Sequence, residues 1–331
     1  MKKRIALLYG GAESEHDVSL MGYEYVSELL HGSEYEILPI YVAKDGKWSA
    51  EIDGEASSVY PTSKHGGSLY TERGFIKPDC AIPLLHGEGG EDGSVQGALE
   101  CAGIPYIGAN VITSAICLDK AYTKAIASSL GIPTLKGVSP PRYESTEAVL
   151  KKCKDAIGFP MFIKPRRLGS SVGAYPVSNE SDFHELYTKA SEIGDGLVMV
   201  ERCLKSKREL ECAFVEVDGK AIITPPGEIL IDGFYGYNEK YGGKTHTAPR
   251  AEVDESLAKL IAEYSTALAE AVMLRHLGRI DFFVFDGEVY FNEINTFPGF
   301  TKESLYPKML MSVGIDPKDA MISFIEDALF W

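Results

Sequence analysis

Arg279-Ile-Asp-Phe-Phe-Val-Phe-Asp-Gly-Glu-Val-Tyr-Phe-Asn-Glu-Ile-Asn295 decides the fold, because this stretch predicts a single antiparallel β-hairpin. Two runs rich in β-branched and aromatic residues flank Asp286-Gly287, a dipeptide typical of a two-residue hairpin turn. Side chains alternate between the two faces of a strand, so Glu293 and Asn295 share one face of the second strand. Folding the hairpin is expected to bring both of them next to Asp281 on the first strand.

Those three side chains suit a hard metal ion. Two carboxylates and an amide oxygen are the kind of ligands that Mg²⁺ takes alongside the phosphates of a nucleotide. The same residues also fit the solvated face of an ordinary hairpin, where Asp and Glu are common. The hairpin by itself therefore leaves a metal site and an exposed polar face equally open.

A second signal lies in Phe162-Ile-Lys-Pro-Arg-Arg-Leu-Gly-Ser-Ser-Val-Gly173, where a lysine ends an apolar run and a Gly/Ser turn follows. Lys164 and the backbone N–H groups of the turn could bind phosphate oxygens. The segment is not a Walker A loop, because the lysine precedes the turn. A β-turn beside a solvated lysine explains the segment equally well on its own. Because the segment occurs together with the carboxylate hairpin, a nucleotide is favoured as its ligand.

Two glycine-rich segments nearer the N-terminus carry acidic residues instead of basic ones. Gly10-Gly-Ala-Glu-Ser-Glu-His-Asp-Val-Ser-Leu20 lacks the glycine spacing of a dinucleotide turn, and its carboxylates would repel a pyrophosphate. Glu15 suits the ammonium group of an amino acid, although a glutamate at the start of a helix is favourable without any ligand. The loop from Leu85 to Gly97 fits an ammonium-bearing or hydroxylic ligand, or simple turn chemistry. Its His86, taken alone, is more typical of a structural hydrogen bond.

Composition narrows the class of protein. A net charge of −15 over 331 residues argues against a nucleic-acid or anionic-membrane partner. The apolar run from Ile5 to Tyr9 is too short for a signal peptide, and no stretch is long enough to span a bilayer. The six cysteines are scattered without a C-x-x-C pair, which is typical of reduced core residues. We therefore expect a cytoplasmic protein.

Strand-like and helix-like segments alternate at the N-terminus. Strands are expected at Arg4 to Tyr9, Tyr35 to Val42 and Cys80 to Leu85, and a helix at Val18 to Leu30. This order indicates a doubly wound α/β domain with a mostly parallel sheet, whose ligands bind beyond the carboxyl ends of the strands. The expected domains are residues 1–118, 119–207 and 208–331.

Eight segments, taken in order from Gly10 to about Gly314, resemble the motifs of the D-alanine–D-alanine ligases of the ATP-grasp superfamily. Each motif is moderately specific, and the ordered set is highly specific. They are GGAESEHDVSL, HGEGGEDGSVQG, GIPYIG, LDK, IKPRRLGSSVG, YGYNEKY, GRIDFF and NEINTFPGFTKESLYP. The resemblance implies an N-terminal α/β domain and two α+β ATP-grasp domains that clamp ATP between antiparallel sheets. It also implies synthesis of D-alanyl-D-alanine through a D-alanyl phosphate, for peptidoglycan precursors.

The resemblance assigns amino-acid-binding roles to matching residues. Glu15 would bind the ammonium group of the first D-alanine through a polar link with Ser170 and Tyr241, and His86 would contribute to substrate binding. Arg279 and the N–H of Gly299 would stabilise the tetrahedral oxyanion. The carboxylate of the second amino acid would be held by Ser304 and Leu305.

The resemblance likewise implies sites for ATP and for two Mg²⁺ or Mn²⁺ ions. The metal ligands would be Asp281, Glu293 and Asn295. The ATP-binding residues would be Lys120, Lys164, Gly169, Ser170, Ser171, Glu201, Arg202, Leu204, Glu209, Lys240 and Asn292, of which Glu201 to Glu209 match the adenine–ribose segment and Lys240 would contact the transferring phosphate. The expected partners are two D-alanine molecules, ATP and a second copy of the chain in a homodimer, without nucleic acid or membrane.

The choice of acceptor is the open question. A ligase of the same family that uses D-lactate or D-serine is the alternative, and His246 near the aromatic loop around Tyr235 keeps it open. The pair Lys240-Tyr241 resembles the dipeptide-forming members, and Leu305 leaves no extra donor for a serine hydroxyl, so D-alanine is favoured. A nicotinamide-dependent dehydrogenase is disfavoured by the missing glycine fingerprint. A non-catalytic binding protein is disfavoured because every expected metal ligand and phosphate-binding cation is present.

Overall fold

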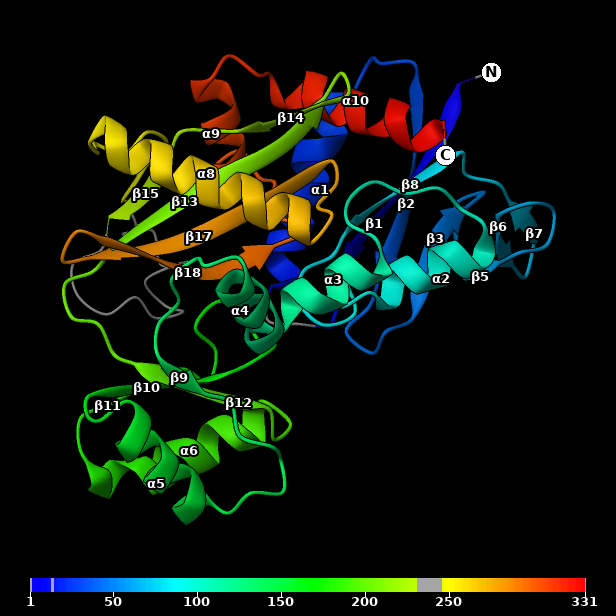
Figure 1. The fold of residues 1–331 in the computed structure, drawn as a ribbon. Helices are drawn as coiled ribbons and strands as arrows, with labels where there is room; N and C mark the ends of the chain where they lie inside the picture. The colour runs from blue at the N-terminus through cyan, green and yellow to red at the C-terminus, as the bar shows by residue number, and fades with distance from the viewer. Residues whose placement is uncertain (1, 13–14, 231–245, 331) are drawn as a thin grey trace.

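The computed structural model describes residues 2–12, 15–230 and 246–330 of the chain. These residues form a mixed α/β structure with four sheets, in which most strand pairings are antiparallel (Figure 1). Among the described residues, no helix combines the length and the apolar character needed to cross a membrane.

The N-terminal sheet has the strand order β4-β3-β2-β1-β8. Strand β1 pairs in parallel with β2 and β8, whereas β3 and β4 are antiparallel. The expected parallel arrangement therefore holds for β2, β1 and β8 only, because β3 and β4 follow β2 through short turns, which force an antiparallel return. The strands are β1 (Lys3–Gly10), β2 (Tyr35–Val42), β3 (Trp48–Ile52), β4 (Glu55–Ser58) and β8 (Cys80–Leu84).

Helices cover both faces of this sheet, as the apolar run of β1 predicts. Leu7 packs in one buried cluster with Val26 of α1 (His16–Leu30), and Leu8 packs in another with Leu99 of α2 (Ser94–Ala102). Burial of both faces explains why the run is continuously hydrophobic. A small antiparallel sheet lies beside this unit, formed by β5 (Tyr60–Thr62), β6 (Ser68–Thr71) and β7 (Gly74–Ile76).

The middle sheet is antiparallel, with the order β11-β10-β12-β9. Met161 and Ile163 of β10 pack against α5 and α6, so the alternate residues Phe162 and Lys164 point to the opposite face. The elements are β9 (Gly137–Val138), β10 (Met161–Pro165), β11 (Tyr175–Val177), β12 (Val198–Arg202), α5 (Thr146–Ala156) and α6 (Glu180–Ile193).

The C-terminal sheet has the order β16-β15-β13-β17-β18, with β14 paired to β13, and all its pairings are antiparallel. Helix α8 packs on one face, and α9 and α10 pack on the other (Figure 1). The strands are β13 (Arg208–Val217), β14 (Lys220–Ile223), β15 (Gly227–Leu230), β16 (His246–Ala248), β17 (Leu277–Phe285) and β18 (Glu288–Asn295). The helices are α8 (Glu255–Ala271), α9 (Leu305–Ser312) and α10 (Pro317–Leu329).

Two short helices, α3 (Val111–Leu118) and α4 (Lys120–Ser129), connect the N-terminal sheet to the rest of the chain. Asp119 ends α3 and caps α4 by accepting a hydrogen bond from the N–H of Ala121. The boundaries expected near residues 118 and 207 fall between these helices and just before β13. The division into three domains remains a prediction.

Candidate active site

A cavity of about 980 Å³ lies between the middle sheet and the C-terminal sheet. Its walls come from β10, from the Gly/Ser turn after it, from the segment that leads into β13, and from the β17–β18 hairpin. Eight of the residues expected to bind ATP line this cavity. They are Lys120, Lys164, Gly169, Ser170, Ser171, Leu204, Glu209 and Asn292.

The hairpin that the sequence predicts is present, with a bulge that the sequence pattern does not show. From the turn outward the pairing is regular as far as Phe282 opposite Phe291, and it then jumps so that Asp281 lies opposite Glu293. Asn292 is the extra residue on β18. The bulge allows the neighbours Asn292 and Glu293 both to line the cavity, which a regular strand with alternating side chains would prevent.

A network of charges holds the hairpin side chains in place. Arg279 donates to both carboxylate oxygens of Asp281 at 2.8 Å and forms an ion pair with Glu211 at 3.1 Å. The amide of Asn295 donates to Asp281 at 3.0 Å. Burial acts to lower the pKa of Arg279, but the two carboxylates outweigh it and hold this pKa well above its usual value. The guanidinium therefore stays charged at the cavity wall, as the expected oxyanion role requires.

Glu293 is paired with a cation as well. Lys120 at the start of α4 lies 3.1 Å from its carboxylate and also donates to the carbonyl of Leu168 at 2.8 Å. Burial acts to raise the pKa of Glu293, but the ammonium groups of Lys120 and Lys164 lower it, so the carboxylate stays ionised. Lys120 thus links the β17–β18 hairpin to the segment that leads into the Gly/Ser turn.

The hairpin residues fit a magnesium site by their chemistry. Asp281, Glu293 and Asn295 supply oxygen donors on adjacent strands, and phosphate oxygens commonly complete such a site. No group of three or more His, Cys, Asp or Glu side chains that could hold a metal ion occurs in the described part of the chain. Asp281, Glu293 and Asn295 are therefore candidate ligands for an ion that the phosphates of a nucleotide also bind.

Glu201 is buried and is not among the residues that line the cavity. Its side chain is 2% exposed and forms ion pairs with Lys124 at 2.8 Å and with Lys164 at 2.7 Å. The guanidinium of Arg202, the last residue of β12, lies over the ring of Phe285 in β17. Every residue from Cys203 to Glu211 lines the cavity, Leu204 and Glu209 among them.

Lys124, which is 5% exposed, was not predicted from the sequence as part of the site. The available signal was its spacing from Lys120, because residues four apart share a face of a helix. A lysine at this spacing is usually solvated, so the pattern alone gave no reason to bury it. Lys124 is buried because β12 packs against it and brings Glu201 within ion-pair distance.

Asp119 was not predicted either, although it anchors the Gly/Ser turn. Its fully buried carboxylate accepts two hydrogen bonds from Arg166 at 2.8 Å each and one from Arg167 at 3.2 Å. The backbone N–H of Lys120 donates to the carbonyl of Arg166 at 3.1 Å. The start of α4 and the approach to the turn are therefore joined through both side chain and backbone.

The Gly/Ser turn reaches the N-terminal unit. Ser170 and Ser171 both have positive φ angles, 52° and 58°, so the turn bends sharply at these residues. The hydroxyl of Ser170 donates to the carboxylate of Glu15, just before α1, at 2.6 Å. This contact is the first half of the polar link that the resemblance implies. The second half, Tyr241, lies outside the described residues, as does the whole aromatic loop around Tyr235, residues 234–243, which includes Lys240.

The loop after β8 holds the segment that follows the hairpin. Glu91 is buried, and its two carboxylate oxygens accept from the N–H groups of Gly87 and Phe297, both at 3.0 Å. The Nδ1 atom of His86 lies 3.1 Å from the carbonyl oxygen of Phe297. The N–H and the carbonyl of Phe297 are therefore both hydrogen-bonded to one loop. These contacts fix the course of the chain just ahead of Gly299.

The clamped segment leads into the residues expected to bind the second amino acid. Gly299 lies so close to Ser304 that a Cβ atom there would be 3.1 Å from the serine oxygen. Ser304 forms a hydrogen bond with Thr301 at 2.8 Å, just ahead of α9. The side chain of Leu305 is buried in the core, so this residue can offer a ligand its backbone N–H at the start of α9.

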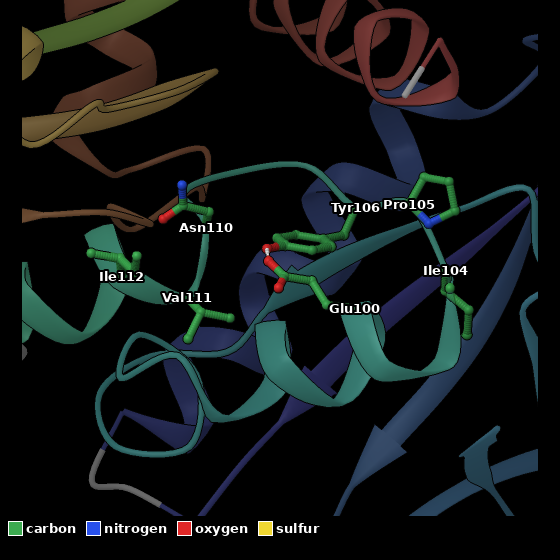
Figure 2. A pocket seen from close by; sticks show the side chains of 8 residues that line it. Glu100, Ile104, Pro105, Tyr106, Asn110, Val111 and Ile112 are labelled. Carbon is green, nitrogen blue, oxygen red and sulfur yellow. Dashed lines mark hydrogen bonds between the residues drawn. The ribbon is translucent and has the colours of Figure 1, made fainter. Parts of the chain in front are cut away.

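A second cavity, of about 440 Å³, lies between α2 and α3 and is lined mainly by apolar side chains (Figure 2). Its principal polar contact is the 2.6 Å hydrogen bond from Tyr106 to Glu100. It has no cation for a phosphate among the residues that line it, and none of the expected site residues lines it. The larger cavity is therefore the candidate nucleotide site.

Comparisons with known proteins show which family the whole chain resembles. The family model described as D-ala D-ala ligase N-terminus matches residues 4–109, and the one described as D-ala D-ala ligase C-terminus matches residues 126–326. A D-alanine–D-alanine ligase from Thermoanaerobacter sp. (strain X514) is 36% identical, over 95% of this chain and 92% of that protein. One from Deinococcus radiodurans is 32% identical, over 99% of both chains.

Solved structures show the same likeness. D-alanyl-alanine synthetase A from Vibrio cholerae superposes with a TM-score of 0.90 at 33% identity, over all of both chains. The VanG D-Ala:D-Ser ligase from Enterococcus faecalis superposes with a TM-score of 0.89 at 31% identity, over 99% of this chain and 100% of that one.

Proposed function

This chain belongs to the D-alanine–D-alanine ligase family, and on that premise we propose that it uses ATP to join two D-alanine molecules. In the first step a carboxylate oxygen of one D-alanine attacks the γ-phosphorus of ATP, which gives D-alanyl phosphate and ADP. In the second step the amine of the other D-alanine attacks the acyl carbon, and inorganic phosphate leaves.

The observation that carries the proposal is the grouping of charges around the larger cavity. Lys120 and Lys164 offer cations for phosphates, while Asp281 and Glu293 face each other across the hairpin. A carboxylate and a triphosphate repel each other, so a ligase needs cationic groups where they meet. Mg²⁺ ions held by Asp281, Glu293 and Asn295 would supply further positive charge there.

The chain's own residues would then act on the two amino acids. Glu15, oriented by Ser170, would hold the ammonium group of the first D-alanine. Arg279 and the N–H of Gly299 would stabilise the tetrahedral oxyanion of the second step, where one such donor is typically worth about 3 kcal/mol. Ser304 and the backbone N–H of Leu305 would bind the second carboxylate. We assign the lid role, which keeps water from the acyl phosphate, to residues 234–243.

The remaining expectations belong to the same proposal. We propose that the protein acts in the cytoplasm as a homodimer, supplies peptidoglycan precursors and takes Mg²⁺ or Mn²⁺. Leu204 and Glu209 would contact the adenine and ribose of ATP, because both line the cavity at the end where β13 begins. Glu201 would act through Lys164, without touching the nucleotide.

The test is phosphate release from ATP, measured with purified protein. Release is expected to require both Mg²⁺ and D-alanine, and L-alanine should not replace D-alanine. D-Lactate and D-serine are offered as competing acceptors, with the products identified by mass spectrometry, because one similar structure is a D-Ala:D-Ser ligase. Equal ATP turnover without any amino acid would contradict the proposal. A mixed product rich in D-serine or D-lactate would change the acceptor while leaving the reaction class in place.

A further inference from the structure

Lys124 lies behind the wall of the nucleotide cavity. Its ammonium group is buried, 2.8 Å from Glu201, and it donates to the backbone carbonyl of Phe291 at 3.3 Å. The other carboxylate oxygen of Glu201 lies 2.7 Å from Lys164, which does line the cavity. Glu201 thus bridges one cation that faces the cavity and one that does not.

Lys124, Glu201 and Lys164 together carry a net charge of +1. Without Lys124, the carboxylate of Glu201 would neutralise Lys164 in a closed ion pair, and a phosphate would have to compete with that carboxylate for the same ammonium group. With Lys124, the buried group carries a net charge of +1. In a poorly solvated site a unit charge acts strongly over several ångströms.

We propose that Lys124 is a positioning residue for nucleotide binding, which holds Glu201 from behind so that Lys164 keeps its positive charge available to the phosphates of ATP. The proposal rests on the proposed function, because it concerns the same nucleotide site. Lys124 acts through Glu201 and does not itself touch the nucleotide.

This arrangement makes nucleotide binding depend on pH. Burial lowers the pKa of Lys124 to about 8, against the opposing effect of Glu201. The charged groups that face it are Glu201 of β12, Lys164 of β10 and Glu293 of β18. The pKa of Glu201 is about 2, because the two lysines outweigh its burial, so this carboxylate stays ionised throughout the alkaline range. Lys124 therefore loses its charge within the alkaline range as pH rises.

The experiment measures ADP binding by calorimetry, with excess Mg²⁺ and no amino acid, from pH 7 to pH 9.5. The phosphates of ADP, with a second pKa of about 6, are already ionised over most of this range. Wild-type protein is expected to bind ADP about tenfold more weakly at the alkaline end, as Lys124 loses its proton. Lys124→Met should bind weakly at every pH, matching the wild type at pH 9.5. The control is Lys151→Met, which changes an exposed lysine of α5 and should follow the wild type.

The outcomes separate the two proposals. If wild-type protein binds no ADP at pH 7, the proposed function fails, and this inference fails with it. If ADP binds but its affinity does not change up to pH 9.5, the role of Lys124 is wrong while the function stands. The role of Lys124 is equally wrong if Lys124→Met keeps the wild-type pH dependence. The Lys124→Arg variant keeps its positive charge, so its affinity for ADP is expected to change little between pH 7 and pH 9.5. If its affinity falls at alkaline pH as much as that of the wild type, a group other than Lys124 causes the effect.

Discussion

Asp281 lies directly opposite Glu293 across the β17–β18 hairpin because one extra residue, Asn292, interrupts the pairing next to them. In the regular register set by the turn, Asp281 would face Asn292 instead, and Glu293 would face Ile280. Glu293 would then point to the other side of the sheet. The bulge is therefore what gathers two carboxylates on the cavity side of one hairpin.

The first prediction concerns Glu293. Glu293→Gln is expected to lower turnover by at least about a hundredfold, because loss of a metal ligand removes several kcal/mol of charge stabilisation in the transition state. The melting temperature should change little. The measurement pairs phosphate release with thermal unfolding, and Glu288→Gln, an exposed residue at the start of the same strand, is the control. Near-normal activity together with a lowered melting temperature would show that Glu293 has a structural role.

The second prediction concerns the contact between Ser170 and Glu15. Ser170→Ala removes the hydroxyl that orients the carboxylate, and a hydrogen bond to a charged group is worth about 1.5–3 kcal/mol. The KM for the first D-alanine is therefore expected to rise by about tenfold or more. Ser170→Gly separates this effect from the backbone, because glycine accepts the positive φ without strain. Both variants should lose activity equally, and wild-type activity in the glycine variant would refute the role of the hydroxyl.

The third prediction concerns the clamp made by Glu91. Glu91→Gln replaces one acceptor oxygen by an NH₂ group that meets the N–H of Gly87 or Phe297, which leaves a buried donor unsatisfied at a cost of about 1–3 kcal/mol. We expect the KM for the second D-alanine to rise and kcat to fall, with the KM for ATP unchanged. Steady-state kinetics with each substrate varied provides the measurement. Glu88→Gln, an exposed neighbour, is the control, and equal changes in all kinetic constants would indicate a general loss of structure.

The fourth prediction concerns the pH dependence of stability at His276. This ring accepts from the N–H of Gly108 at 2.8 Å, and its other nitrogen lies 2.9 Å from Asp327. Burial, the largest influence, lowers its pKa below the ordinary value of 6.5. In the unfolded chain the ring takes up a proton near pH 6.5, before it does so in the folded protein. Stability is therefore present above pH 6.5 and is lost as pH falls through the lowered pKa of the folded state.

The measurement is denaturant unfolding at pH 7.5, 6.5 and 5.5 for the wild type and for His276→Gln. As the pH falls, the free energy of unfolding should decrease more steeply for the wild type than for His276→Gln. The difference in slope should correspond to the uptake of up to about one additional proton per molecule on unfolding. Parallel slopes for the two proteins would show that His276 does not titrate differently on folding.

Much of the fold was readable from local sequence. The apolar run of β1, the hairpin around Asp286-Gly287 and the lysine at the end of β10 all appear where the pattern places them. Each of these depends on side chains close together in the chain, which is why periodicity and turn chemistry suffice. The grouping of Asp281 with Glu293 was also expected. Strict alternation of side chains outward from the turn at Asp286-Gly287, however, would have placed the two residues on opposite faces of the sheet.

The sequence determined by itself the kinds of chemical group that the site contains, because carboxylates, lysines and glycine turns in that order are local features of the chain. Only the tertiary structure decided which of them line the cavity. Glu201 turns to Lys124 and Lys164 instead of the cavity, and the side chain of Leu305 enters the core. Glu91 clamps Phe297 across 206 positions of sequence. Contacts of this kind depend on how separate helices and strands pack against each other. A side chain becomes buried when a segment far away in the sequence packs over it. The hydrophobic pattern within a single helix or strand carries no information about that distant segment.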